Sequence, residues 1–125
     1  MEETKKRRIQ PFDRIRAWQE SRALTKELYL VTAKFPKEEM FGITSQIRRA
    51  SASTMANIAE GSRRETNRDY AHFLNIAEGS MAEVQSFLVL AADLGYLGED
   101  ESKKLIAMAN TIIGMLYRLR QCLDE

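Results

Sequence analysis

The sequence predicts an all-α fold, an up-down-up-down antiparallel four-helix bundle. Its 125 residues are 44% hydrophobic and 30% charged, and six Gly and two Pro leave few helix breakers. Four long segments carry apolar residues at alternating three- and four-residue spacing, the period of a helix with one buried face. The connections between these segments are short, and short connections place consecutive helices side by side and antiparallel.

A proline separates the first two helices. Apolar periodicity predicts a first helix over about 14–34, and Pro36 ends it because the ring excludes Phe35 from the helical region. The second helix is expected over about 38–62, since acidic residues at its start suit a helix N-terminus. Gly42 lies in its first turn, where it allows a bend or a short separate turn.

Capping signals mark the third and fourth helices. Thr66 and Asp69 have the spacing of a capping box, so the third helix is expected to start there and to end at a C-cap at Gly95. The fourth helix is expected over about 99–123, beginning with three acidic residues. Cys122 falls on its apolar seam and is predicted to be a small core residue.

One hexapeptide, Asn-Ile-Ala-Glu-Gly-Ser, occurs at 57–62 and again 18 residues later. Gly61 in the first copy is predicted to end the second helix. Gly79 in the second copy lies inside the third helix, where glycine costs about 1 kcal/mol relative to alanine. We therefore expect Gly79 to permit a close helix crossing against Ser51 and Ala52.

The charge is distributed unevenly along a chain whose formal net charge is +1. Residues 1–68 carry a balance of +6, and residues 69–125 carry −5. Such asymmetry is typical of a nucleic-acid-binding face, but it also arises when two halves attract each other on folding or self-assembly. Residues 1–11 are expected to form a flexible basic tail, and residues 12–125 a single four-helix-bundle domain.

The residue inventory argues against catalysis. One cysteine, Cys122, and one histidine, His72, exclude an internal disulfide and cannot supply the ligands of a usual zinc site. The sequence has no phosphate loop, dinucleotide fingerprint or metalloprotease motif. We expect no enzyme activity, no catalytic residue, no metal and no cofactor. No window approaches 18 uncharged apolar residues and no signal core follows the charged N-terminus, which predicts a cytoplasmic protein without membrane association.

Arginines supply the candidate nucleic-acid contacts, because the planar guanidinium binds phosphate oxygens bidentately. No RNA-recognition, K-homology or zinc-knuckle motif accompanies them, so binding is expected to be electrostatic and sensitive to salt. The predicted contact residues are Arg7, Arg8, Arg14, Arg16, Arg22, Arg48, Arg63, Arg64 and Arg68.

A stripe of polar residues follows the second helix at three- and four-residue spacing. Its members Gln46, Arg49, Asn57 and Glu60, together with Glu78 on the third helix, are interpreted as a structural clamp that fixes helix register. Arg49 is expected to pair with Glu78 or Glu60.

Apolar residues outside the main seams predict self-association. A small bundle cannot hide them all, and a second apolar face commonly forms a homo-oligomer. These residues are Trp18, Tyr29, Ile106, Ile113 and Tyr117.

Several motifs together resemble those of the 23S rRNA-intervening-sequence proteins. They are residues 46–50, 57–61 and 76–80 with Glu83, together with Ala17-Trp18-Gln19 and Phe35-Pro36. The resemblance implies a four-helix bundle, a ring-shaped homopentamer as in some members, and a link to large-subunit ribosomal RNA genes. Retroelement accessory variability proteins, thought to bind nucleic acid, are distantly similar.

The function that we predict from the residues and this resemblance is that of a non-catalytic oligomer. It associates with RNA, or with a nucleic-acid-processing protein, through an arginine-rich surface. The alternative is a protein-interaction scaffold without direct nucleic-acid binding.

Overall fold

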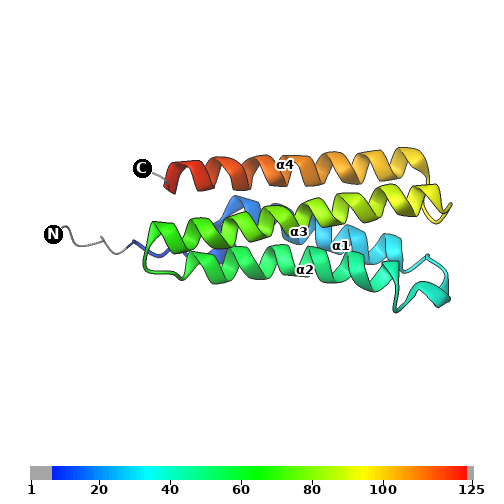
Figure 1. The fold of residues 1–125 in the computed structure, drawn as a ribbon, viewed down its shortest axis with the longest axis horizontal. Helices are drawn as coiled ribbons and strands as arrows, with labels where there is room; N and C mark the ends of the chain where they lie inside the picture. Colours follow the sequence, from blue (N-terminus) through cyan, green and yellow to red (C-terminus); the bar gives the residue numbers. More distant parts are fainter. Residues whose placement is uncertain (1–6, 124–125) are drawn as a thin grey trace.

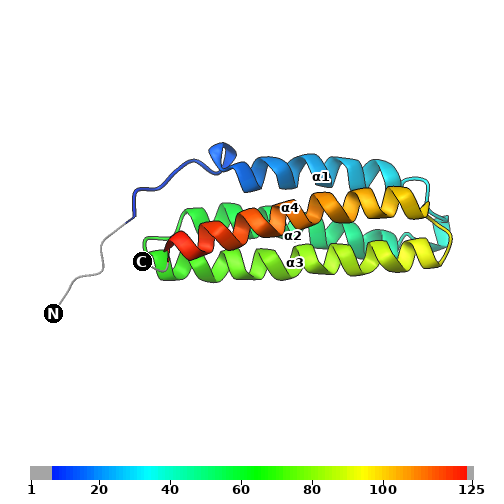
Figure 2. The same cartoon turned by 90° about the horizontal axis from the view of Figure 1, so that it is seen from above.

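The computed structural model describes residues 7–123 and confirms the predicted four-helix bundle. Its helices are α1 (Arg16–Thr32), α2 (Ile43–Ser62), α3 (Asn67–Asp93) and α4 (Glu99–Leu123), with short 3-10 turns η1 (Phe12–Arg14) and η2 (Lys37–Glu39). Figures 1 and 2 show the four helices running nearly parallel to one long axis. α3 packs along both α2 and α4, and α1 also contacts these two helices.

The connections alternate between the two ends of the bundle. Figures 1 and 2 place the α2 to α3 connection and the end of α4 at one end, and the chain that precedes α1 runs from this end to the start of α1. The α1 to α2 and α3 to α4 connections lie at the other end. The up-down-up-down topology therefore gathers segments that are far apart in the sequence.

Helix ends follow the predicted capping chemistry in α3. The Thr66 hydroxyl accepts a hydrogen bond from the Asp69 backbone N–H at 3.1 Å, which satisfies a donor of the first turn. Gly95 has φ +77° and ends α3 in a Schellman motif, in which Tyr96 N–H donates to the Ala91 carbonyl at 3.0 Å. Because this turn needs a left-handed residue, glycine is the natural choice there.

The start of α2 differs from the predicted boundary. Residues 37–39 form the separate turn η2, and the helix begins only at Ile43, after Gly42 with φ −111° and ψ −121°. α1 likewise begins at Arg16 and is preceded by η1. Gly42 therefore interrupts the helical backbone, where the sequence allowed either a bend or a separate turn.

Large aliphatic side chains from all four helices fill the core. The most completely buried include Leu24, Leu28, Ile47, Ile58, Leu74, Met81, Leu88, Ile112 and Leu116. Several buried hydroxyls, those of Ser21, Thr32 and Thr54, donate to the backbone carbonyl four residues earlier, as Ser21 does to Ala17 at 2.7 Å. The core thus accommodates small polar residues by pairing them locally.

α2 ends at Ser62, next to Gly61 as predicted, but the close helix approach that we expected at Gly79 is wrong. Gly79 is exposed, and a Cβ atom there would meet nothing within 4 Å. Gly61 is buried inside α2, where a Cβ atom would lie 2.6 Å from Cβ of Phe73 on α3. In the register in which α2 and α3 pack, Ser53 contacts Ser80 at 3.1 Å and Gly79 faces outward. The close crossing expected at Gly79 is therefore at Gly61.

Cys122 is exposed, so its predicted place in the core is wrong. The buried positions of α4 are Leu105, Ala109, Ile112 and Leu116, and partly buried Leu119 and Leu123 continue that seam. Near the end of α4 the buried stripe therefore passes through Leu116, Leu119 and Leu123, and Cys122 lies beside it.

Candidate nucleic-acid interface

The fold concentrates arginine at one end of the bundle. Segments 7–22, 60–78 and 117–123 meet there, and they carry ten arginines, six carboxylates and no lysine. We call this part of the molecule the arginine end. Segments 33–45 and 92–105 form the acidic end, which has four lysines, six carboxylates and no arginine. The charge asymmetry of the sequence therefore becomes a polarity along the long axis of the bundle.

Five of the predicted contact arginines are exposed at the arginine end. Across residues 7–123, their guanidinium groups make no hydrogen bond, ion pair or ring contact with another described residue. Their charges therefore face solvent without a protein partner in this range. These residues are Arg8, Arg14, Arg16, Arg63 and Arg68.

Arg7 is instead part of the protein's own framework. Its guanidinium donates hydrogen bonds to the carbonyls of Ser62 and Arg64, both at 3.0 Å, and lies 4.2 Å from the ring centroid of Tyr70. The last carbonyls of a helix lack partners within the helix, so this cation caps α2 favourably. Residues 1–6 of the predicted flexible tail, which spans 1–11, lie outside the described residues. From Arg7 onward, the chain is fixed against the bundle by these contacts.

Burial raises the pKa of Tyr70, and the neighbouring Arg7 cation opposes part of that rise. The hydroxyl therefore releases its proton at a higher pH than an exposed tyrosine does. At the acidic end, Tyr96 donates a hydrogen bond to Glu39 at 2.8 Å, and this bond raises the pKa of Tyr96. Each tyrosine joins segments that are distant in the sequence.

Three more predicted contact arginines have neighbours on the protein. Arg48 donates to Thr32 Oγ1 at 2.9 Å and to the Tyr29 carbonyl at 3.3 Å, linking α2 to the end of α1, so it lies away from the arginine end. Arg64 pairs with Glu60 at 2.8 Å, and the Arg22 guanidinium lies 5.8 Å from the Trp18 ring centroid.

The polar stripe does join helices, but with partners that differ from those predicted. Arg49 reaches Glu83 on α3 at 2.6 Å and also donates to Gln46. The expected pairing of Arg49 with Glu78 or Glu60 is wrong. Glu60 instead pairs with Arg64, and Glu78 pairs with Arg120 on α4 at 2.7 Å. The register of α2 and α3 places Glu83 opposite Arg49, a relation that helical spacing alone does not define.

The remaining stripe residue, Asn57, bonds within its own helix. Its amide donates to the Ser53 carbonyl at 2.9 Å and to the Ser53 hydroxyl at 3.2 Å. Ser53 in turn contacts Ser80 on α3. The stripe therefore contributes two separate polar contacts between α2 and α3, Arg49 with Glu83 and Ser53 with Ser80, whereas Glu78 joins α3 to α4.

The groups that could carry chemistry are dispersed over the described residues. His72 is exposed and contacts Phe73 edge to face at 5.8 Å between centroids, and Cys122 is exposed in the last turn of α4. Across residues 7–123, no group of three or more His, Cys, Asp or Glu side chains is placed to hold a metal ion. In the same range, no helix is both long enough and apolar enough to span a membrane.

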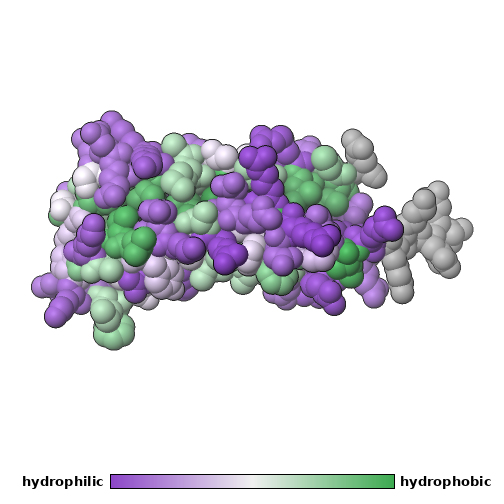
Figure 3. Space-filling view, turned by 180° about the vertical axis from the view of Figure 1, so that it is seen from behind, coloured by the Kyte–Doolittle hydropathy of each residue, from purple (hydrophilic) through white to green (hydrophobic). Residues whose placement is uncertain are grey.

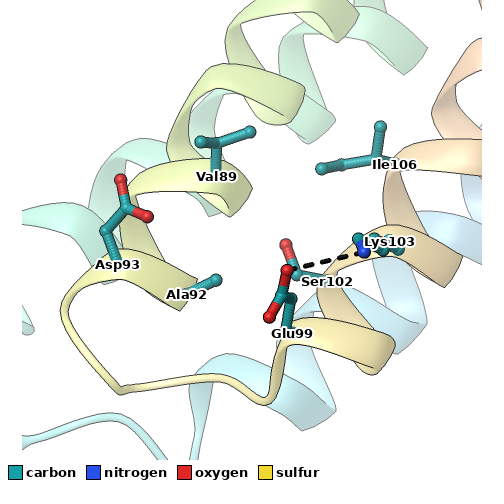
Figure 4. A pocket seen from close by; sticks show the side chains of 7 residues that line it. All are labelled: Val89, Ala92, Asp93, Glu99, Ser102, Lys103 and Ile106. Atoms are coloured by element: carbon teal, nitrogen blue, oxygen red, sulfur yellow. Dashed lines mark ion pairs between the residues drawn. The ribbon is translucent and has the colours of Figure 1, made fainter.

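A hollow of about 270 Å³ lies between α3 and α4 at the acidic end (Figure 4). Val89 and Ile106 point toward it, and Glu99 pairs with Lys103 at its rim at 3.4 Å. The Ser102 hydroxyl already donates to the Leu88 carbonyl at 2.9 Å. Because no described base contacts that hydroxyl, the hollow has the features of a surface cleft and not of a nucleophile site.

Of the five residues predicted to form a second apolar face, Tyr29 and Tyr117 are about half exposed. Trp18, Ile106 and Ile113 are instead partly buried and pack against the core. Other apolar side chains are exposed on α1, α3 and the connections that follow these two helices, among them Leu30, Phe41, Ile76, Val89, Leu90 and Leu94. Figure 3 shows hydrophobic patches interspersed with hydrophilic side chains on the face seen there.

The architecture and the arginine end define an all-α bundle protein with one strongly cationic end. The model of the 23S rRNA-intervening sequence protein family matches residues 13–118, and the chain belongs to this family. A search of curated proteins gives no match.

One solved structure is similar over most of the chain. It is a protein of unknown function from the S23 ribosomal protein family of Bacteroides thetaiotaomicron. The two chains are 21% identical, with a TM-score of 0.77 over 84% of this chain and 95% of that one. At this identity the likeness shows the shared fold alone.

Proposed function

We propose that this chain is a non-catalytic RNA-associated protein that binds the phosphate backbone through its arginine end. The observation that carries the proposal is the set of five exposed arginines, without a protein partner among residues 7–123, that segments 7–22 and 60–78 contribute to one end. Unpaired guanidinium groups bind phosphates without first breaking an internal ion pair. The family description, which refers to 23S ribosomal RNA, supports RNA as the nucleic acid.

The arginines with neighbours refine the predicted contact set. Arg7, Arg48 and Arg64 hold parts of the fold together, so their replacement would disturb structure as well as charge. We therefore assign phosphate binding to Arg8, Arg14, Arg16, Arg63 and Arg68, with Arg22 beside them. This choice separates binding variants from stability variants.

A matched pair of variants tests the proposal. One replaces Arg14, Arg16, Arg63 and Arg68 by alanine, and the other replaces the four acidic-end lysines Lys34, Lys37, Lys103 and Lys104. Each removes four positive charges, so the net charge changes equally. With a fluorescently labelled ribosomal RNA fragment at about 50 mM salt, the arginine variant is expected to lose at least tenfold in affinity and the lysine variant little. Equal losses would show that only net charge matters.

The alternative function is a protein-interaction scaffold. Exposed apolar residues on α3, including Ile76, Val89 and Leu90, favour contact with another protein chain. If the wild type binds no RNA at low salt and recovers one defined protein partner in pull-downs, the scaffold function replaces RNA binding.

We also propose that the chain forms a closed homo-oligomer. The exposed apolar residues support this proposal, and the number five comes from the resemblance alone. Light scattering coupled to gel filtration at micromolar concentration measures the mass directly. A mass near 14.4 kDa at every concentration would contradict the proposal, whereas a mass about five times larger would agree with a pentamer.

A further inference from the structure

A second hollow lies at the arginine end, between the N-terminal segment and α2. Its volume is about 570 Å³, and its lining is mainly apolar: Ile9, Pro11, Phe12 and Ala59, with Glu60 and Arg63. Sites for small molecules have volumes of about 300–1,000 Å³ and combine apolar walls with a few polar groups. This hollow has both properties.

An exposed aromatic ring forms part of its wall. Phe12 is 40% exposed, although it contacts Trp18 edge to face with 4.8 Å between ring centroids. Arg7 holds the N-terminal segment against the α2 to α3 connection, so the wall is fixed at its outer side as well. An aromatic ring held in place and open on part of its surface is the usual platform for a stacked nucleobase.

The charges at the rim determine which part of a nucleotide would enter. Glu60 is already paired with Arg64 at 2.8 Å, whereas Arg63 is exposed and has no partner among residues 7–123. An uncharged base therefore fits the apolar hollow, and its flanking phosphate fits Arg63. Arg14 lies close by in the sequence, at the end of η1, and extends the cationic surface.

We propose that this hollow binds one unpaired base of single-stranded RNA, stacked on Phe12, with the neighbouring phosphate on Arg63. The inference rests on the proposed RNA association, and it specifies that the RNA is single-stranded at this site. A base inside a duplex is already stacked and paired, so it cannot enter the hollow. Single-stranded segments are therefore preferred over duplexes with the same number of phosphates.

Trp18 provides a direct measurement because it is the only tryptophan of the chain and contacts Phe12. The full-length protein is titrated at about 50 mM salt with a single-stranded oligoadenylate and with an RNA duplex of equal phosphate number. The oligoadenylate is expected to change Trp18 emission and to bind more tightly than the duplex. Equal affinities for the oligoadenylate and the duplex, with an unchanged Trp18 emission, would overturn the proposal.

Three substitutions separate stacking from structure. Phe12→Leu keeps an apolar side chain without a ring and is expected to weaken single-strand binding about 5- to 100-fold, with duplex affinity unchanged. Phe12→Tyr keeps the ring and is expected to bind like the wild type. Phe41→Leu is the matched control, since Phe41 is a 94% exposed phenylalanine at the acidic end.

The outcomes distinguish this inference from the function on which it rests. If the wild type binds neither RNA at low salt, the proposed RNA association fails and the stacking site fails with it. If the wild type binds RNA but Phe12→Leu binds the oligoadenylate as tightly as the wild type, or loses both RNA forms equally, only the stacking site is wrong.

Discussion

A Cβ atom placed on Gly61 would lie 2.6 Å from the Cβ atom of Phe73, so α2 and α3 approach each other through a glycine. The same hexapeptide places Gly79 on an open surface of α3, with nothing within 4 Å of its missing Cβ. The same motif therefore places one glycine where a Cβ atom has no room and the other where a Cβ atom would face open space. This difference provides a comparison in which the local sequence is constant.

Alanine at the two glycines is expected to have opposite effects on stability. Gly61→Ala forces α2 and α3 apart and is expected to lower the free energy of unfolding by about 1–3 kcal/mol. Gly79→Ala removes an exposed helix glycine and is expected to raise it by about 0.5–1 kcal/mol. Urea unfolding followed by circular dichroism measures both changes. A stabilising Gly61→Ala would contradict the close helix approach.

The two interhelical ion pairs of α3 are expected to contribute different amounts to the free energy of unfolding. Glu78 and Arg120 are 15% and 24% exposed and bond through two oxygens, whereas Glu83 and Arg49 are 44% and 54% exposed. Solvent screens the second pair more strongly. We expect Glu78→Gln to cost about 1–2 kcal/mol and Glu83→Gln less than about 0.5 kcal/mol. Equal costs in urea unfolding would show that burial does not set their strength.

Replacing Arg7 tests whether the N-terminal segment stabilises the bundle. Arg7→Ala removes two hydrogen bonds to carbonyls at the end of α2 and uncovers Tyr70, with an expected loss of about 1 kcal/mol. Arg8→Ala is the matched control, since Arg8 is exposed, and its effect is expected within about 0.5 kcal/mol. Hydrogen exchange at residues 62–66 should increase only in Arg7→Ala. Identical exchange in both variants would contradict this role.

Tyr70 predicts a loss of stability at high pH. Burial raises its pKa in the folded protein, so between the unfolded value near 10 and the folded value only the unfolded chain releases the proton. The stabilising contribution is therefore complete below about pH 10 and decreases as the pH rises through the folded pKa. Tyr70→Phe should lose less stability between pH 9 and 11 than the wild type. If urea unfolding shows that Tyr70→Phe and the wild type lose equal stability over this pH range, groups other than Tyr70 cause the loss.

The helices could be predicted from the sequence because their periods and caps are local properties. Pro36, Thr66 and Gly95 mark boundaries through interactions within a few residues. The rotation and register of the helices are tertiary properties, and no local pattern defines them. For this reason the helical spacing of Arg49 did not identify Glu83, and the apolar seam of α4 did not show that Cys122 is exposed.

The candidate interface could be predicted only in part. The sequence identified the arginines, but not which of them the fold uses for its own contacts, as it does Arg7 and Arg48. Their gathering at one end follows from the antiparallel topology, since helix starts and ends alternate along the chain. The hollow beside Phe12 depends on the path of the N-terminal segment along α2, and no periodic sequence pattern predicts that path.

The salt dependence of RNA binding tests the central proposal most directly. If the arginine end binds phosphates, the logarithm of the association constant should fall linearly with the logarithm of salt concentration. The slope should be about 0.7–0.9 per phosphate contact, and each contacting arginine removed should reduce it by about one. The variant lacking Arg14, Arg16, Arg63 and Arg68 should therefore have a much shallower slope than the wild type, and the four-lysine variant an unchanged slope. A wild-type slope near zero, or the same slope in all three proteins, would contradict RNA binding through the arginine end.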